Sequence, residues 1–403
     1  MGKPKIRFKG YEDDWEQRKL GEMIKEYKET VDSDCILPVL TSSKTEGVIL
    51  QEEHFGRKQQ HDITGYNILP RNYCTYRNRS DGVDFTFNIN KCCDKGIISK
   101  FYPVFSGNNS DVFFISLLLN NSDEIVQEIA YTCTGTGQKV LSFLDLQKMK
   151  IKVPNFEEQK KIAAYFDHLD HLITLHQRKC EETKSLKKYM LQKMFPENGK
   201  CVPEIRFSGF SDAWEQRKLG EIYGSIGNAF VGTATPYYVE QGHFYLESNN
   251  VKDGQINHNS EIFINDEFYE KQKDKWLHTG DVVMVQSGHV GHAAVIPKEL
   301  NNTVAHALIM FRNPKEEIEP YFLNYEYQTD KVKKKIENIT TGNTIKHILA
   351  SDMQEFVVDV PKYEEQKVIA SYFSHLDHLI TLHKHKCDEL QKLKKFMLQN
   401  MFV

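Results

Sequence analysis

Several features that would place a protein in a membrane, outside the cell or around a metal are missing from this sequence of 403 residues. No run approaches the roughly eighteen apolar residues of a membrane span, and the start, MGKPKIRFKG, has no signal-peptide apolar region. The eight cysteines are scattered without a CxxC pair, which disfavours structural zinc and a disulfide scaffold. We therefore expect a cytoplasmic protein with reduced thiols, no metal and no contact with a membrane.

Motifs of several enzyme classes are missing as well. The sequence contains no GxxxxGK[ST] phosphate loop, no GxSxG nucleophile elbow, and no Asp/Asn-Pro-Pro-aromatic segment that would clamp a flipped base. The segment GTGQKV at 135–140 has two of the three glycines of a dinucleotide-binding motif but opens no helix. We therefore expect no catalytic activity and no cofactor on this chain.

Composition and length indicate a globular protein of two or more domains. Hydrophobic residues make up 40% and charged residues 27% of the sequence. The net charge of −4 does not itself indicate nucleic acid. A DNA-binding surface would therefore require basic residues segregated onto one face.

Two segments of the sequence occur twice, and they define its organisation. Residues 4–22 and 203–221 share 14 of 19 positions, including WEQRKLGE, and residues 153–195 and 360–402 share 30 of 43. The offset is 199 in the first pair and 207 in the second, so the second intervening segment is eight residues longer. We call the repeated segments the frame and the dissimilar segments between them the inserts. Two near-identical frames with different inserts indicate two modules that do the same task on different targets.

The inserts have the pattern of mixed α/β domains. Short β-branched and aromatic runs such as 73–76 and 282–285 are bounded by Gly, Asn, Asp and Ser. Each insert ends in a predicted helix followed by a loop with matching Thr, Gly and Lys, CTGTGQK at 133–139 and TTGNTIK at 340–346. Glycine gives such a loop its backbone freedom, and Thr and Lys supply hydrogen-bond donors.

The longer repeated block has the spacing of a coiled-coil helix. Apolar positions recur at steps of four and three, as in Phe166, Leu169 and Ile173, and the seam is interrupted by Lys187 and Lys394. About 40 residues at 1.5 Å each give a helix of roughly 60 Å. One such helix alone would expose its apolar stripe, so we expect the two copies to pack against each other in antiparallel fashion, with an approximate two-fold axis relating the units.

The segment HLDHL, at 168–172 and again at 375–379, allows two interpretations. Histidines three residues apart on a helix, with an aspartate between them, can bind a metal. The same residues can instead belong to the packing and partner-facing surface of the helix. No third strong ligand follows at a helical spacing, which favours the second interpretation.

The duplicated frame resembles the specificity subunit of type I restriction–modification enzymes. The resemblance rests on WEQRKLGE at the start of each unit and on VP-x-x-EEQ-x-x-IA-x-YF leading into the long helix, and it covers the whole chain. It implies an α+β fold in which two globular mixed α/β target recognition domains are separated by two long antiparallel helices. The expected boundaries are 1–152 for the first recognition domain with its repeat, 153–196 for the first helix, 197–221 for the linker and second repeat, 222–359 for the second domain, and 360–403 for the second helix.

The resemblance also implies function and partners. Each recognition domain would read one half of a bipartite target in double-stranded DNA, while the helices would set the spacer and dock two methyltransferase subunits. Two restriction subunits would complete the enzyme, and S-adenosylmethionine, ATP and Mg would bind to the partner subunits. This chain itself would be non-catalytic.

Candidate DNA-binding residues follow from the need for polar side chains at base edges and cations at phosphates. The base-reading candidates are Thr41, Ser42, Ser43, Lys44, Arg71, Arg77, Asn78 and Arg79 in the first insert, and Asn249, Asn250, Lys252, Gln286, Ser287, His289 and His306 in the second. The candidates for phosphate contacts are Thr134, Gly135, Lys139, Thr341, Gly342 and Lys346. Asn and Ser in turns often serve only to cap the backbone, so each also has a purely structural interpretation.

Two other functions remain open at this point. A coiled-coil adaptor for protein partners would explain the helices but not two unlike globular inserts. An enzyme that cuts or methylates DNA by itself would need motifs that the sequence lacks.

Overall fold

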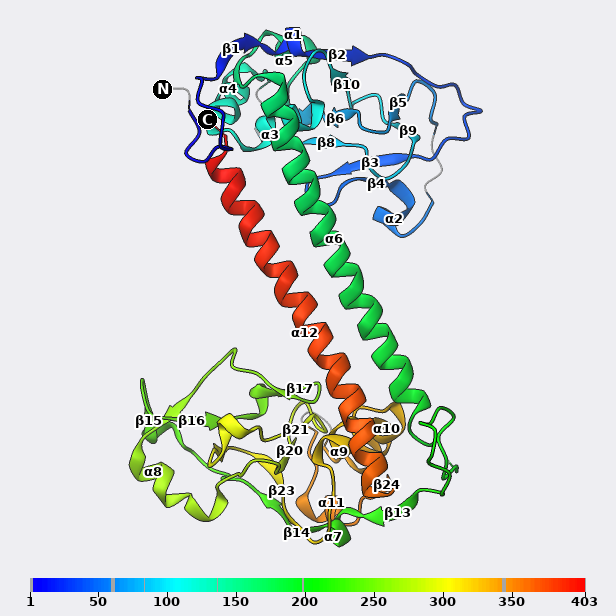
Figure 1. Ribbon diagram of the computed structural model, residues 1–403, viewed down its shortest axis with the longest axis vertical. Coiled ribbons are helices and arrows are strands. Elements are labelled where there is room, and N and C mark those ends of the chain that lie inside the picture. Colours follow the sequence, from blue (N-terminus) through cyan, green and yellow to red (C-terminus); the bar gives the residue numbers. More distant parts are fainter. Residues whose placement is uncertain are drawn as a thin grey trace. The chain divides into compact units, whose positions relative to one another are not determined.

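The computed structural model describes residues 3–58, 62–82, 84–135, 137–197, 199–342 and 346–402. The chain forms two compact units, unit 1 with Met1–Gln177 and His385–Val403, and unit 2 with Arg178–Lys384. Helix α6 (Phe156–Lys193) begins in unit 1 and ends in unit 2, whereas α12 (Tyr363–Asn400) begins in unit 2 and ends in unit 1 (Figure 1). Each unit therefore contains one half of each long helix.

The remaining elements of unit 1 come from the N-terminal part of the chain. They are β1 (Glu16–Lys19), α1 (Leu20–Met23), β2 (Ile24–Tyr27), β3 (Leu40–Ser43), β4 (Gly47–Leu50), α2 (Gln51–Phe55), β5 (Asn67–Pro70), β6 (Cys74–Tyr76), β7 (Arg79–Ser80), β8 (Phe87–Ile89), β9 (Lys95–Ile98), β10 (Val104–Gly107), α3 (Val112–Asn121), α4 (Asp123–Thr132), β11 (Lys139–Val140), α5 (Phe143–Lys148) and β12 (Lys150–Val153).

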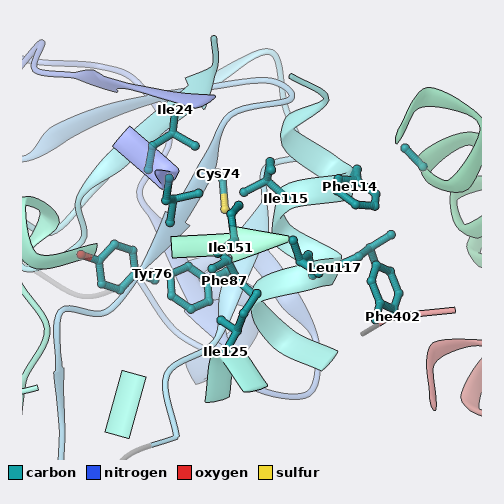
Figure 2. Packing of buried hydrophobic residues seen from close by; sticks show 14 of the residues in the cluster. Ile24, Cys74, Tyr76, Phe87, Phe114, Ile115, Leu117, Ile125, Ile151 and Phe402 are labelled. Atoms are coloured by element: carbon teal, nitrogen blue, oxygen red, sulfur yellow. The ribbon is translucent and has the colours of Figure 1, made fainter. Parts of the chain in front are cut away.

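An antiparallel sheet with the strand order β2-β10-β6-β8 lies at the centre of unit 1. Its middle strand β6 is buried at every position, and the strongly apolar helix α3 contributes Phe114 and Ile115 to the same core. Figure 2 shows these side chains together with Phe402, which comes from the end of the chain. The C-terminal end of α12 is thus part of the core of unit 1.

Unit 2 contains a corresponding set of elements. They are β13 (Glu215–Lys218), α7 (Leu219–Ile222), β14 (Tyr223–Asn228), β15 (Tyr238–Val239), β16 (His243–Leu246), β17 (Val251–Lys252), β18 (Gln255–Ile256), β19 (Phe263–Ile264), α8 (Asp266–Lys271), β20 (Val282–Val285), β21 (Ala293–Val295), β22 (Val304–Ala305), β23 (Leu308–Pro314), α9 (Pro320–Glu326), α10 (Asp330–Ile339), α11 (Ala350–Gln354) and β24 (Val357–Val360), with 3₁₀ turns η1 (Thr235–Tyr237), η2 (Ser248–Asn250), η3 (Lys273–Lys275) and η4 (Lys298–Leu300).

The central sheet of unit 2, β14-β23-β20-β21, has the same strand order as that of unit 1 although the inserts differ in sequence. Strand β20 (VVMV), like β6, is buried at every position. Unit 2 adds a second sheet, β15-β19-β16-β22, whereas unit 1 has the strand pairs β3-β4 and β5-β9. The inserts therefore share a core and differ in what is attached to it.

The repeated sequence motifs form one cluster of buried polar contacts in each unit. In unit 1 the Arg7 guanidinium donates two hydrogen bonds of 2.7 Å to the Glu158 carboxylate, and in unit 2 Arg206 binds Glu365 in the same way. The next residue of each EEQ motif, Gln159 or Gln366, donates to the carbonyl oxygen of the Pro in the Val-Pro pair, at 2.9 Å. These contacts explain why IRF and VP-x-x-EEQ occur twice.

The predicted seam between the long helices is present within each unit. Leu169 and Ile173 of α6 share the core of unit 1 with Cys387 and Leu390 of α12. In unit 2, the Cys180 thiol donates to the Ile380 carbonyl oxygen at 3.8 Å, and Lys187 Nζ lies 2.7 Å from Asp377 Oδ1. Contacts advance along α6 as they retreat along α12, so the helices are antiparallel.

The first long helix begins three residues later than the expected 153–196. Val153 is still the last residue of β12, and Asn155 caps the helix because its side-chain oxygen accepts the Glu158 backbone N–H at 3.0 Å. Pro154, which lies between them, cannot donate to a helical hydrogen bond.

In each unit an ion pair joins the helix before the Thr-Gly loop to the strand before the long helix, and the polarity of the pair is opposite in the two units. In unit 1 Lys152 on β12 lies 3.0 Å from Glu124 on α4, whereas in unit 2 Asp359 on β24 binds Lys331 on α10. Both pairs of positions differ by 207, the offset of the long repeat. The strand residue before each long helix therefore carries the charge that complements the helix of its own insert.

Glu326 gives unit 2 a stability that depends on pH. Burial raises the pKa of its carboxyl from 4.5 to about 8, and one of its oxygens has no hydrogen-bond partner in the described structure. The equivalent position of α3, seven residues after the helix cap in both units, is the buried Leu118. The fold therefore does not require an acid at this position.

We expect Glu326→Gln to stabilise the protein increasingly as the pH rises. Because the folded state holds the carboxyl protonated, wild-type stability falls as pH rises from about 4.5 through 8, and the neutral amide avoids a loss of about 3.5 kcal/mol between pH 5 and pH 8. Thermal melting across this range measures the difference. Glu337→Gln, at an exposed position of α10, is the control. A melting difference for Glu326→Gln that is constant with pH would contradict the assignment.

Candidate nucleic-acid interface

In unit 1 the Arg-Asn-Arg run and the Thr-Gly loop, far apart in sequence, lie side by side. Strand β7, which contains Arg79, pairs with β11, which contains Lys139, and the Leu141 N–H donates to the Asn78 carbonyl oxygen at 3.0 Å. Thr134 forms a bridge with Val140 across the loop. The structure thus brings together a predicted base-reading segment and a predicted phosphate-contact segment.

The β3–β4 hairpin joins the same surface. The Asn88 amide donates to the Ser42 hydroxyl at 2.8 Å and to the Ser43 carbonyl oxygen at 2.9 Å, and Lys44 forms an ion pair with Asp84. A cavity of about 380 Å³ lies between these segments. Its lining includes Ser42, Lys44, Arg77, Arg79, Asp84 and Tyr102. Thr41 lies on β3 beside Ser42.

Charge on this surface is not fully neutralised within the protein. Arg77 is exposed and has no ion pair among the described residues, while the Arg79 guanidinium lies 4.6 Å from the centre of the Phe101 ring. The hydrogen bond from Lys44 lowers the pKa of the Asp84 carboxyl, which keeps this acid ionised within the cavity. Arg77 is thus a cation of this cavity that is available to a ligand.

Arg71 forms its contacts outside this cavity. Its guanidinium donates to the Asp94 carboxylate at 2.8 Å and to the Lys91 carbonyl oxygen at 2.9 Å, which closes the turn between 71 and 94. The structure does not bring it to the cavity that Arg77 lines.

Unit 2 repeats this arrangement with different residues. The turn after β20 pairs with the second Thr-Gly loop, because Ser287 bridges to His347 and the Gly288 N–H donates to the Lys346 carbonyl oxygen at 3.2 Å. Thr341 bridges to His347 across the loop, as Thr134 does to Val140. A cavity of about 300 Å³ at this turn is lined by residues that include His289, His292, Lys333 and Lys346.

Backbone contacts define which residues are equivalent in the two units. The Ile348 N–H donates to the Gln286 carbonyl oxygen at 3.0 Å, as the Leu141 N–H does to that of Asn78. Asn78 therefore corresponds to Gln286, and Arg79 to Ser287. Both side-chain amides have a buried oxygen without a hydrogen-bond partner in the described structure. Sequence comparison of the inserts does not reveal this correspondence.

The other candidates of the second insert lie in different surroundings. Asn250 is buried, and its amide donates to the carbonyl oxygens of Asn257 and Ser260, so it shapes the loop from inside, beside the exposed Asn249. Lys252 is exposed on β17, one residue before Asp253, whose N–H donates to His292 Nδ1 at 3.3 Å. His306 Nε2 donates to the Gly232 carbonyl oxygen at 3.1 Å, away from the turn after β20.

The sequence did not identify several residues of these two surfaces. Burial lowers the pKa of His292, which links the β17–β18 turn to the turn after β20. Lys333 reaches the cavity from an exposed position of α10, and Asp84 and Tyr102 line the cavity of unit 1. In the sequence, only the proximity of His292 to the candidate His289 pointed to one of these residues. The positions of the others depend on tertiary structure.

The HLDHL aspartates serve the helix seam. Asp170 forms an ion pair with Lys394, and Asp377 binds Lys187 and accepts the Tyr325 hydroxyl at 2.9 Å, while His168 and His171 are exposed. Within the described ranges no three His, Cys, Asp or Glu side chains gather as metal ligands would. No helix in the part of the chain that the structure covers is long and apolar enough to cross a membrane.

Comparison with known proteins identifies the family. The model of the type I restriction modification DNA specificity domain matches residues 12–185 and 211–392, one match for each frame and insert. These two matches cover most of the chain. The protein therefore belongs to the type I restriction–modification specificity family.

Two curated relatives agree with this assignment. The putative type I restriction enzyme MjaX specificity subunit of Methanocaldococcus jannaschii is 26% identical over 267 residues, which are 65% of this chain and 60% of that protein. The MjaVIII specificity subunit of the same organism is 24% identical over 269 residues, 65% and 63% of the two chains. The match thus spans about three fifths of these curated relatives.

A solved structure shows the same fold. The crystal structure of the type I restriction–modification S subunit from M. genitalium aligns with a TM-score of 0.62 and 12% identity, covering 100% of this chain and 99% of that one. The expected fold class, two mixed α/β domains with two long antiparallel helices, is confirmed.

The first Thr-Gly loop depends on Gly135, and we expect Gly135→Ala to loosen it. Gly135 has φ +101°, and a Cβ there would lie 2.3 Å from the Gln138 carbonyl oxygen. The strain should cost about 1–3 kcal/mol locally and speed amide hydrogen exchange at Val140, which donates to Thr134 across the loop, and at Leu141, which donates to Asn78. Gly137→Ala, where a Cβ meets open space, is the control. Equal exchange in the two variants would refute the role of Gly135.

Proposed function

We propose that this chain is the DNA sequence-specificity subunit of a type I restriction–modification complex, with each unit reading one half of a bipartite target. The observation that carries the proposal is the repetition of one backbone frame with different side chains at equivalent positions. Arg79 in unit 1 corresponds to Ser287 in unit 2, beside Thr-Gly loops whose Thr, Gly and Lys are the same. Two different half-sites would be read with the same phosphate contacts.

The side chains at the turns fit base contacts, and those in the Thr-Gly loops fit phosphate contacts. Arginine binds guanine O6 and N7 with two hydrogen bonds, and Asn or Gln binds adenine in a similar way. Arg77 is available for the first contact, and the amides of Asn78 and Gln286 lie at the corresponding turns. Lys139 and Lys346, in loops that allow close backbone approach, would hold phosphates and set the register on the duplex.

The long helices provide surfaces for the partner subunits of the complex. Leu186 and Tyr189 of α6 are 45% and 52% exposed, and the equivalent Leu393 and Phe396 of α12 are 41% and 53% exposed. Apolar side chains left exposed at the same place in each repeat fit a partner that binds twice. We assign these sites to two methyltransferase subunits, and two restriction subunits complete the enzyme.

In this proposal the chain contributes recognition and the partners contribute chemistry. S-adenosylmethionine, ATP and Mg would bind to the methyltransferase and restriction subunits. The helices α6 and α12 run unbroken for 38 residues each, and their fixed length would set the spacer between the half-sites.

An exchange of modules within the chain tests the proposal. Replacing residues 23–153 by residues 222–360 gives both frames the second insert, together with its own Lys331–Asp359 pair. Because each insert would read one half-site, we expect the complex to methylate a target in which the second half-site occurs twice. Mapping of methylated adenines in cells that express the complex measures this. Retention of the original target, or loss of both half-sequences, would disprove one half-site per insert.

The junction of this exchange has its own control. Placing residues 222–352 in the position of 23–145 leaves Lys331 facing Lys152 instead of Asp359, which should lower stability by about 1 kcal/mol. Lys152→Asp in that hybrid should restore the melting temperature.

We expect Arg77→Ala to relax discrimination at one base pair of the first half-site. Loss of a two-bond contact to guanine costs about 1–3 kcal/mol at that position, and the second half-site should be unaffected. Binding to duplexes that carry each base pair in turn measures this. Arg71→Ala is the matched control, because Arg71 is already held by Asp94 and Lys91. Weakening by Arg77→Ala that is uniform across sequences would class the contact as a phosphate contact.

A further inference from the structure

Unit 2 contains a larger cavity, beside the candidate base-reading turn, that the proposed function does not use. It has a volume of about 670 Å³ and lies among the C-terminal part of α6, the middle of α12, and helices α9 and α10. Its cationic lining consists of Lys184, Lys187, Lys188, Lys333 and Lys384. We call this cavity the lysine pocket.

Three of the five lysines have no carboxylate partner. Lys187 is neutralised by Asp377 at 2.7 Å, and Lys184 by Glu181 at 2.7 Å. Among the described residues no ion pair involves Lys188, Lys333 or Lys384. The acids Asp253 and Asp330 also line the pocket, so these three lysines outnumber them. A concave surface with excess positive charge concentrates anions.

The lysine pocket is continuous with the turn after β20. Gly291, His292 and Lys333 line both the lysine pocket and the cavity at that turn. Asp253, next to the candidate Lys252, forms part of the pocket wall and lies 3.9 Å from His292 Nδ1. A duplex whose bases meet the turn would therefore extend its backbone toward the lysine pocket.

Three of the five equivalent positions of unit 1 are not basic. The repeat offset places Gln391 at the position of Lys184 and Gln177 at that of Lys384, and the helix caps Ser122 and Thr329 align Val126 with Lys333. Lys187 and Lys188 retain lysines, Lys394 and Lys395, at their counterparts. At this pocket, the repeated helices therefore carry more positive charge in unit 2 than at the equivalent positions of unit 1.

We propose that the lysine pocket binds backbone phosphates of the DNA next to the half-site read by unit 2, a sequence-independent contact that unit 1 lacks. The proposal rests on the proposed function. A nucleic-acid backbone fits better than a protein surface, because lysine is depleted at protein interfaces and common at phosphates. Lys188 and Lys384 lie on the long helices, so the helices themselves would contact DNA in unit 2.

The salt dependence of DNA binding tests the pocket. The variant Lys188→Gln/Lys333→Gln/Lys384→Gln is compared with Lys271→Gln/Lys275→Gln/Lys298→Gln, which removes the same charge from exposed positions of α8 and η4 and a half-buried position of η3. Full-length chains bind two labelled duplexes, one with the methylation-mapped target and one without, over a range of salt concentrations. Each phosphate contact contributes about 0.9 to the slope of log affinity against log salt.

We expect the pocket variant to reduce this slope by about two to three on both duplexes, and the control variant to change it by less than one. A pocket variant with the wild-type slope would overturn the proposal. So would a wild-type slope together with loss of copurifying methyltransferase subunits, which would assign the pocket to a protein partner. Melting temperatures of both variants confirm that they are folded.

Two further comparisons separate this inference from the proposed function. Preference of the wild type for the target duplex tests the proposed function, whereas the change in slope tests the pocket on either duplex. The reverse variant, Val126→Lys/Gln177→Lys/Gln391→Lys, should steepen the slope by creating the pocket in unit 1. A reverse variant without this effect would contradict the phosphate contact.

Discussion

The buried pair between arginine and glutamate at the start of each long helix is the contact on which the frame depends. The Glu158 and Glu365 side chains are at most 1% exposed, and each is satisfied only by the two-bond contact from Arg7 or Arg206. Loss of either arginine would leave a buried charge without its partner, which is far more costly than loss of a surface pair. The adjacent Gln159 also accepts the Asp111 N–H at the cap of α3. One turn of helix therefore joins the N-terminal segment, the long helix and the insert.

This anchoring explains how the inserts can diverge. The central sheets have the same strand order although β6 (CTY) and β20 (VVMV) differ in sequence, because both strands need only to be fully buried. The turns that follow these strands face solvent, so their side chains are free to differ. Asn78 and Gln286 occupy one backbone position with different reach, as two readers of different sequences would. Specificity can change there without disturbing the core.

The sequence predicted the repeated segments and the local secondary structure. The four-three spacing predicted the seam residues Phe166, Leu169 and Ile173, all of which are buried. The Arg-Asn-Arg run and the Thr-Gly loop were found separately, and their contact was not predictable because β7 and β11 pair across a long stretch of chain. The burial of Asn250 and the capture of Arg71 by Asp94 likewise depend on loops that turn back on themselves. Those residues remain predictions as DNA contacts.

The two lysines that interrupt the apolar seam, Lys187 and Lys394, form ion pairs between the long helices. In the sequence, Lys187 and Lys394 only weaken the apolar stripe. In the structure, each meets the aspartate of an HLDHL segment, and the Lys187 and Asp377 side chains are only 12% and 17% exposed. A slip of one helical turn would leave these charges among apolar neighbours, so the pairs disfavour other registers in a way that an apolar stripe does not. To set a spacer as proposed, the helices would need a fixed register as well as a fixed length, and these two ion pairs fix the register.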